Sequence, residues 1–171
     1  MRLVTGVLAA IGLVASVTVY VLTFFPGRIV IAPNQALFAT LHIGAMAAFI
    51  PFVWALRQRL GVFPRSWRQY LSVFPAWAAT LIVLAVACET VNFLYLFFEL
   101  QGSPEIRDGQ FVLMNHGTFV RTLTQEEYDV ARSHETRLFS GGWIAFYLIP
   151  TLYFLFTPKP AASSRAERQS P

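Results

Sequence analysis

The sequence predicts an all-α membrane protein, with four transmembrane helices and a small extracytoplasmic ββα insertion between the third and the fourth. Composition is the first observation: 56% of the 171 residues are hydrophobic and only 13% are charged, against about 25% charged in a typical soluble domain. The second is a mean hydropathy of +0.54. The third is that one long polar stretch, residues 99–142, interrupts an otherwise almost continuously apolar chain.

The first predicted span covers about residues 3–25, which is long enough to cross a hydrocarbon core of ~30 Å at ~1.5 Å per residue. Its apolar run is longer than that of an ordinary signal peptide, so we expect an uncleaved helix. Small side chains would form one side of this helix and let another helix approach closely. They are Gly6, Gly12, Ala15 and Ser16.

Three further spans complete the predicted organisation, with the first three spans together occupying residues 1–98. The tail is rich in Pro, Ala, Ser and Arg and is predicted to be disordered. In chain order, the segments after the first span are a second span at about 35–56, a loop at 57–70, a third span at 71–98, the polar insertion at 99–142, a fourth span at 143–157 and the tail at 158–171.

The distribution of charge predicts the orientation. The 57–70 loop carries four arginines and no acid, whereas the 99–142 insertion carries seven acids and four arginines. Basic loops stay in the cytoplasm, so we expect both termini inside and the insertion outside. The compact size and the lack of a eukaryotic targeting signal favour a bacterial inner membrane. We expect the loop arginines to contact anionic lipid rather than nucleic acid. They are Arg57, Arg59, Arg65 and Arg68.

Local chemistry predicts a β-hairpin and a helix within the insertion. Two β-prone runs within residues 111–122 flank His116–Gly117, and Asn-His-Gly tolerates the positive φ angles of a tight hairpin turn. Thr124 and Glu127 have the spacing of a capping box at a helix N-terminus. We expect the helix that follows to end at Gly141–Gly142.

Glu89 is the most costly residue of the predicted spans, because an acid inside a membrane costs ~2.5–3.5 kcal/mol. It should therefore face protein and have a hydrogen-bonding partner. Asn92 lies three residues later on the same helical face, and Tyr95 continues that face. His42 is predicted at a similar depth in the second span. Two interpretations of this intramembrane polar site remain open: a hydrogen bond that serves helix packing, or a functional site for a proton, an ion or a polar substrate.

No cofactor is expected. His42, Glu89, His116 and His134 are of types that bind zinc or iron, but no local ligand spacing supports a metal site. His116 is interpreted as a turn residue, and His134 with Glu135 as a solvated pair. The sequence holds no Walker loop, no Gly-x-Ser-x-Gly, no His-Glu-x-x-His and no Cys-x-x-Cys. No catalytic residue is therefore assigned.

These observations favour a non-enzymatic interaction protein, either an accessory subunit or an immunity- or inhibitor-type partner. Its insertion would contact another membrane protein or a second copy, and the hairpin would offer an edge to which a partner adds a strand. An intramembrane proton, ion or metal site at His42 and Glu89 is the alternative, and an enzyme acting on lipid is the third hypothesis. The residues expected to take part in the interaction are Phe111, Leu113, Asn115, His116, Phe119, Tyr128 and His134.

Overall fold

The computed structural model describes residues 1–25, 35–61, 66–99 and 102–158. Within these ranges the chain is mostly helical, and four helices are long and apolar enough to cross a membrane, as predicted. The elements are α1 (Arg2–Leu22), α2 (Ala36–Leu60), α3 (Trp67–Leu71), α4 (Ala76–Glu99), β1 (Ser103–Arg107), β2 (Gln110–Asn115), β3 (Thr118–Thr122) and α5 (Gln125–Phe156).

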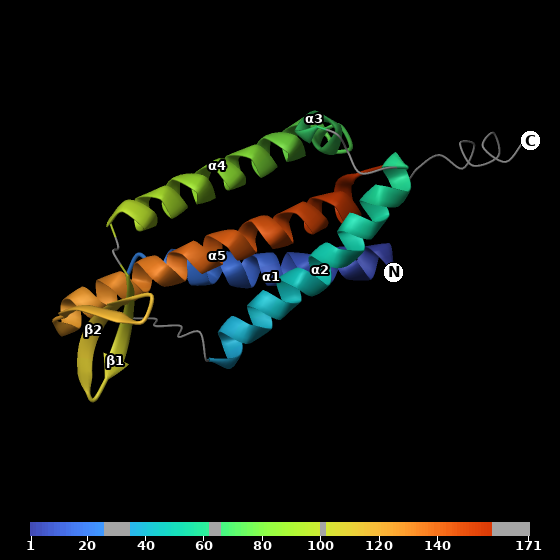
Figure 1. The fold of residues 1–171 in the computed structure, drawn as a ribbon. Helices are drawn as coiled ribbons and strands as arrows, with labels where there is room; N and C mark the ends of the chain where they lie inside the picture. Colours follow the sequence, from blue (N-terminus) through green and yellow to red (C-terminus); the bar gives the residue numbers. More distant parts are fainter. Residues whose placement is uncertain (26–34, 62–65, 100–101, 159–171) are drawn as a thin grey trace, which may run out of the picture.

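Helix α5 lies at the centre of the molecule. Helices α1, α2 and α4 all pack against it, and strands β1 and β2 pack against its first turns (Figure 1). Tyr147 of α5 joins two of these contacts: its hydroxyl donates to the carbonyl of Leu41 in α2 at 2.9 Å, and its ring lies against Gly12 in α1. A Cβ at Gly12 would lie 2.3 Å from that ring. The small-residue side predicted for the first span is therefore a packing surface for α5.

Two arginines close the ends of the antiparallel α1–α5 pair. Arg2 donates to the carbonyl oxygens of Tyr153 and Phe154 at 2.9 and 3.0 Å, in the last turn of α5. Arg137 donates to the carbonyl and the hydroxyl of Thr23, both at 3.0 Å, where α1 ends. The last carbonyls of a helix have no partner within the helix and carry negative partial charge. Each helix thus supplies a cation to the C-terminus of the other.

The insertion contains three strands, not the predicted two. The antiparallel sheet has the order β1-β2-β3, and β1 was missed because Pro104 and the surrounding charges hide its β character. Proline fits here because β1 is an edge strand. The turn at His116–Gly117 is confirmed, since both residues have positive φ (47° and 83°), as a two-residue hairpin turn of type I′ requires.

The predicted end of the insertion helix at Gly141–Gly142 is wrong. Helix α5 runs without a break from Gln125 to Phe156, so the insertion helix and the fourth span are one element. Neither glycine adopts a positive φ angle, which a glycine-terminated helix end normally needs. Packing of α4 against these glycines, described below, explains their presence. The third span also differs, because the short α3 precedes α4 as a separate helix.

The start of α1 and the end of α5 lie at one end of the bundle. Figure 1 shows the N-terminus, α3 and the last turns of α2 and α5 at this end, and the sheet at the opposite end. This arrangement agrees with an even number of crossings. It groups the described arginines of the predicted cytoplasmic segments, Arg2, Arg57, Arg59 and Arg68, on the side away from the sheet.

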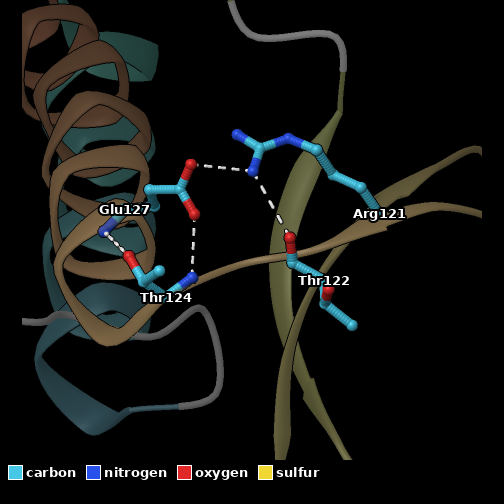
Figure 2. Close-up of polar contacts among 4 residues, drawn as sticks. All are labelled: Arg121, Thr122, Thr124 and Glu127. Atoms are coloured by element: carbon cyan, nitrogen blue, oxygen red, sulfur yellow. Dashed lines mark hydrogen bonds and ion pairs between the residues drawn. The ribbon is translucent and has the colours of Figure 1, made fainter.

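The capping box at the start of α5 is confirmed (Figure 2). The Thr124 hydroxyl accepts from the Glu127 amide at 3.1 Å, and the Glu127 carboxylate accepts from the Thr124 amide at 2.8 Å. Arg121 of β3 also donates to Glu127, at 2.8 Å. The hydrogen bond from the Thr124 amide is the main cause that lowers the pKa of the Glu127 carboxyl, and the hydrogen bond from Arg121 is the second. This group therefore joins the sheet to the helix.

Stability at acid pH tests this group. A carboxyl whose pKa falls on folding stabilises the folded state above its unfolded pKa, and that contribution is lost as the pH falls through the folded pKa. We expect Glu127→Ala to lower the melting temperature at about pH 7 and to differ little from wild type once the pH is below the pKa of the folded carboxyl. Glu126→Ala, one residue earlier and outside the capping box, is the control. A loss with Glu127→Ala that does not shrink in acid would contradict the assignment.

Candidate functional site

The structure gathers most of the predicted intramembrane polar residues between α4 and α5. We call this set the α4–α5 polar seam: Glu89, Asn92 and Tyr95 of α4 together with His134, Gly141 and Gly142 of α5. The α4 residues are three apart, so they share one helical face. The two helices run antiparallel, so positions early in α5 face positions late in α4.

Glu89 lies directly on the backbone of α5. A Cβ built on Gly141 would be 1.8 Å from Glu89 Oε2, whereas one built on Gly142 would be 3.8 Å from Oε1. Only glycine at position 141 leaves room for the carboxylate in this place. The backbone of Gly142 and the amide of Asn92 are the polar groups beside the carboxylate. The predicted burial of Glu89 between helices is thus met in part, since the residue is half-buried.

The rest of the seam is polar but incompletely paired. Asn92 Nδ2 is buried and makes no hydrogen bond within normal geometric limits, so its contact with Glu89 is close without being a formed hydrogen bond. The ring of Tyr95 packs against that of His134, with centroids 5.4 Å apart. His134 Nδ1 lies 3.5 Å from Arg137 Nη1. A side chain predicted to be solvated therefore lies against α4.

His42 does not join this seam. It is exposed, accepts from Trp143 Nε1 at 3.3 Å and stacks on Phe38 at 5.9 Å. Within the described residues it makes neither a hydrogen bond nor an ion pair with Glu89, and α2 and α4 pack against different sides of α5 (Figure 1). Similar depth in the membrane did not imply contact, because a third helix lies between the two.

The interaction residues predicted in the insertion divide into two groups. Phe111 packs on Tyr128 of α5 with ring centroids 4.7 Å apart, and Leu113 is buried. Phe111 therefore holds the sheet on the helix. The second group faces away from the molecule and comprises Asn115, His116 and Phe119, all exposed.

Arg132 is the most important residue that sequence reasoning missed. It is 8% exposed, forms an ion pair with Glu135 and donates to the Pro104 carbonyl at 2.9 Å. Its guanidinium also lies 5.6 Å from the centre of the Tyr128 ring. The ion pair has the i,i+3 spacing of a helix, which a sequence can show, but the contact with β1 depends on the fold.

No group of three His, Cys, Asp or Glu side chains that could hold a metal ion occurs in the described part of the chain. The chain matches no protein-family model, no curated protein and no solved structure. Function has therefore to be inferred from the contacts described above.

The two adjacent glycines give a matched test of the seam. Alanine at either position gains about 1 kcal/mol of helix propensity. At position 141 the new methyl group would also overlap the Glu89 carboxylate and force it to move, and overpacking of this kind costs ~1–3 kcal/mol. We therefore expect Gly141→Ala to lower the melting temperature in lipid nanodiscs and Gly142→Ala to leave it unchanged or raise it.

Removing the carboxylate separates this effect from general crowding. In a Glu89→Ala background, Gly141→Ala should no longer destabilise, since the new methyl group meets no carboxylate. Equal destabilisation by Gly141→Ala in both backgrounds would show that the glycine serves another contact.

Proposed function

We propose that this protein is a multi-pass inner-membrane protein that acts as a non-enzymatic accessory or interaction subunit, with its three-stranded sheet outside the cytoplasm as the contact surface. The observation that carries the proposal is the exposed edge strand β3 on a sheet that is otherwise fixed to α5. All five residues of β3 are exposed, including Phe119 at 56% and Val120 at 40%.

The orientation rests on charge. The end of the bundle that holds the described cytoplasmic-loop arginines is opposite to the sheet. Arginine-rich segments resist translocation, and the sheet with the first turns of α5 carries most of the acids. These features support cytoplasmic termini, a periplasmic sheet and residence in a bacterial inner membrane.

The sheet is held firmly enough to present a fixed surface. Arg132 ties β1 to α5 through the Pro104 carbonyl, the Arg121–Glu127 ion pair ties β3 to the helix start, and Phe111 packs on Tyr128. A small sheet has too little core to be stable alone. A surface fixed in this way loses little conformational entropy when a partner binds.

Strand β3 is suited to pairing with an added strand over only part of its length. Its register with β2 is irregular: Leu113 pairs with Arg121 and Met114 with Phe119, which leaves Val120 as an extra residue. Such bulges limit uncontrolled pairing at a sheet edge. A partner would therefore have to match this irregular edge, either by adding a strand or by covering Phe119, which favours a specific contact.

The alternative function, an intramembrane proton or ion site, would rest on Glu89 without His42. Among the described residues Glu89 has no ion-pair partner. The groups beside it are an amide side chain and the α5 backbone, and the Tyr20 phenol is close enough to interact with it electrostatically. These contacts favour helix packing as the role of Glu89.

Site-specific photo-crosslinking in cells tests the proposed surface. We expect a photoreactive phenylalanine analogue at Phe119 to give one discrete crosslinked product, because the partner covers this side chain. The same analogue at Ile106 is the matched control, since Ile106 is 58% exposed on the other edge strand. A product of twice the mass of this chain would identify self-association as the interaction.

Two outcomes would contradict the proposal. The absence of any discrete product at Phe119 would show that the β3 edge has no partner. Products of equal yield and pattern at both positions would show random collision in the membrane rather than a specific surface.

A further inference from the structure

Three polar side chains beside α5 lie close together and are only partly paired. Glu89 and Asn92 belong to α4, and the Tyr20 phenol of α1 is close enough to Glu89 to interact with it electrostatically. Asn92 Nδ2 is buried without a hydrogen bond, and the Tyr20 hydroxyl is hydrogen-bonded to no residue of the described chain. The Asn92 amide and the Gly142 backbone beside Glu89 leave part of the about four acceptor positions of its carboxylate unfilled. We call Tyr20, Glu89 and Asn92 the Tyr20 cluster.

Water is the ligand that the Tyr20 cluster suits best. A buried donor without an acceptor destabilises a fold, and lipid supplies no acceptor inside a candidate membrane span. A bound water needs about two to four polar partners, and the cluster offers an amide donor, a carboxylate acceptor and a hydroxyl that can both donate and accept. A metal cation fits less well, because the Asn92 N–H groups repel it and the Arg137 guanidinium also lies within electrostatic range of Tyr20.

Polar side chains continue from the cluster toward the sheet. Tyr95 lies six residues after Glu89 on α4, ~9 Å nearer to the sheet, and its ring packs on that of His134 with centroids 5.4 Å apart. His134 Nδ1 in turn lies 3.5 Å from Arg137 Nη1. Tyr95 is 49% exposed and His134 is half-buried. These groups therefore give water polar partners between the cluster and the end of α4 that adjoins the sheet.

The opposite side of the cluster is apolar and closely packed. Ile82 lies two helical turns before Glu89, ~10 Å toward the other end of α4, and is 7% exposed. It belongs to a buried apolar cluster that includes Phe52 of α2, Phe74 before α4 and Leu152 of α5. Such side chains offer water no hydrogen-bonding partner. Packing of this kind closes the path for water from that side.

We propose that the Tyr20 cluster binds water that enters from the sheet side of the membrane only. The water accepts from Asn92 Nδ2 and donates to the Glu89 carboxylate, so both groups are satisfied while Glu89 keeps its place on Gly141. In the proposed orientation the sheet side is extracytoplasmic. The water site does not depend on the β3 surface, so either proposal can fail alone.

Radiolytic footprinting in lipid nanodiscs tests the binding of water, because hydroxyl radicals formed from bound water oxidise the side chains next to it. We expect Tyr20 to be oxidised several-fold more than Val91, each measured relative to the denatured protein. Val91 is the matched control, since it lies between Glu89 and Asn92 along α4 but is 67% exposed on another face, where lipid would cover it. Glu89→Leu should remove most of the oxidation of Tyr20, because the water loses the carboxylate to which it donates.

Silver ions test the direction of entry, since Ag⁺ is small, needs water and binds a cysteine thiolate. In a Cys88→Ala background, Ag⁺ applied from the sheet side should protect Asn92→Cys from a maleimide added after solubilisation. Ag⁺ applied from the other side should give no protection. Val91→Cys should stay unprotected from both sides, and Gln110→Cys in β2 identifies the sheet side in the same membranes.

Three results would overturn the proposal. Oxidation of Tyr20 no greater than that of Val91 would show that the cluster binds no water. Any pattern for Asn92→Cys other than protection from the sheet side alone would contradict the direction of entry. Equal protection of Asn92→Cys and Val91→Cys would show that Ag⁺ reaches α4 without a polar path. Circular dichroism of each variant verifies that the helices are retained.

Discussion

Close packing against α5 is the constraint on which the rest of the structure depends. Three helices and two strands have to share the surface of one element of 32 residues, about 48 Å long at ~1.5 Å per residue. In the proposed membrane setting, lipid supplies no hydrophobic force between helices, so close contact and polar bonds would have to hold them together. The chain achieves this close contact by placing small residues where helices approach each other. Gly12 faces Tyr147, and Gly141 faces Glu89. At the ends of the α1–α5 pair, Arg2 and Arg137 supply charged hydrogen bonds to carbonyls at the C-terminal end of the partner helix.

The continuity of α5 gives the sheet a direct mechanical connection to the candidate membrane spans. Arg132 and the Arg121–Glu127 ion pair fix the sheet to the first turns of α5. The same helix continues past the polar seam to the turn that Arg2 caps. A load on the sheet would therefore act on the helix that α1, α2 and α4 all contact. This arrangement fits the proposed role of holding a partner in a defined position relative to the bilayer.

The sequence predicts the four long apolar helices, the hairpin turn and the capping box because these follow from local chemistry: apolar length, the conformational freedom at His116–Gly117 and the Thr124–Glu127 spacing. The sequence does not predict the features that tertiary contacts determine. Gly141 and Gly142 resemble a helix end, yet they are the place where Glu89 lies on α5. His42 and Glu89 have similar depths, but depth says nothing about which side of a neighbouring helix a residue faces. Strand β1 is missed because pairing with β2, rather than its own propensity, makes it a strand.

The central claim is that the sheet and the basic end lie on opposite sides of a membrane. Cysteine labelling in a Cys88→Ala background tests it most directly, with single cysteines at Gln110 in β2 and at Gln58 in α2, both of which are exposed. A membrane-impermeant maleimide added to intact cells with a permeabilised outer membrane should label the Gln110→Cys protein and spare the Gln58→Cys protein until the inner membrane is opened. Labelling of Gln58→Cys from outside, or of both positions from the same side, would contradict the account.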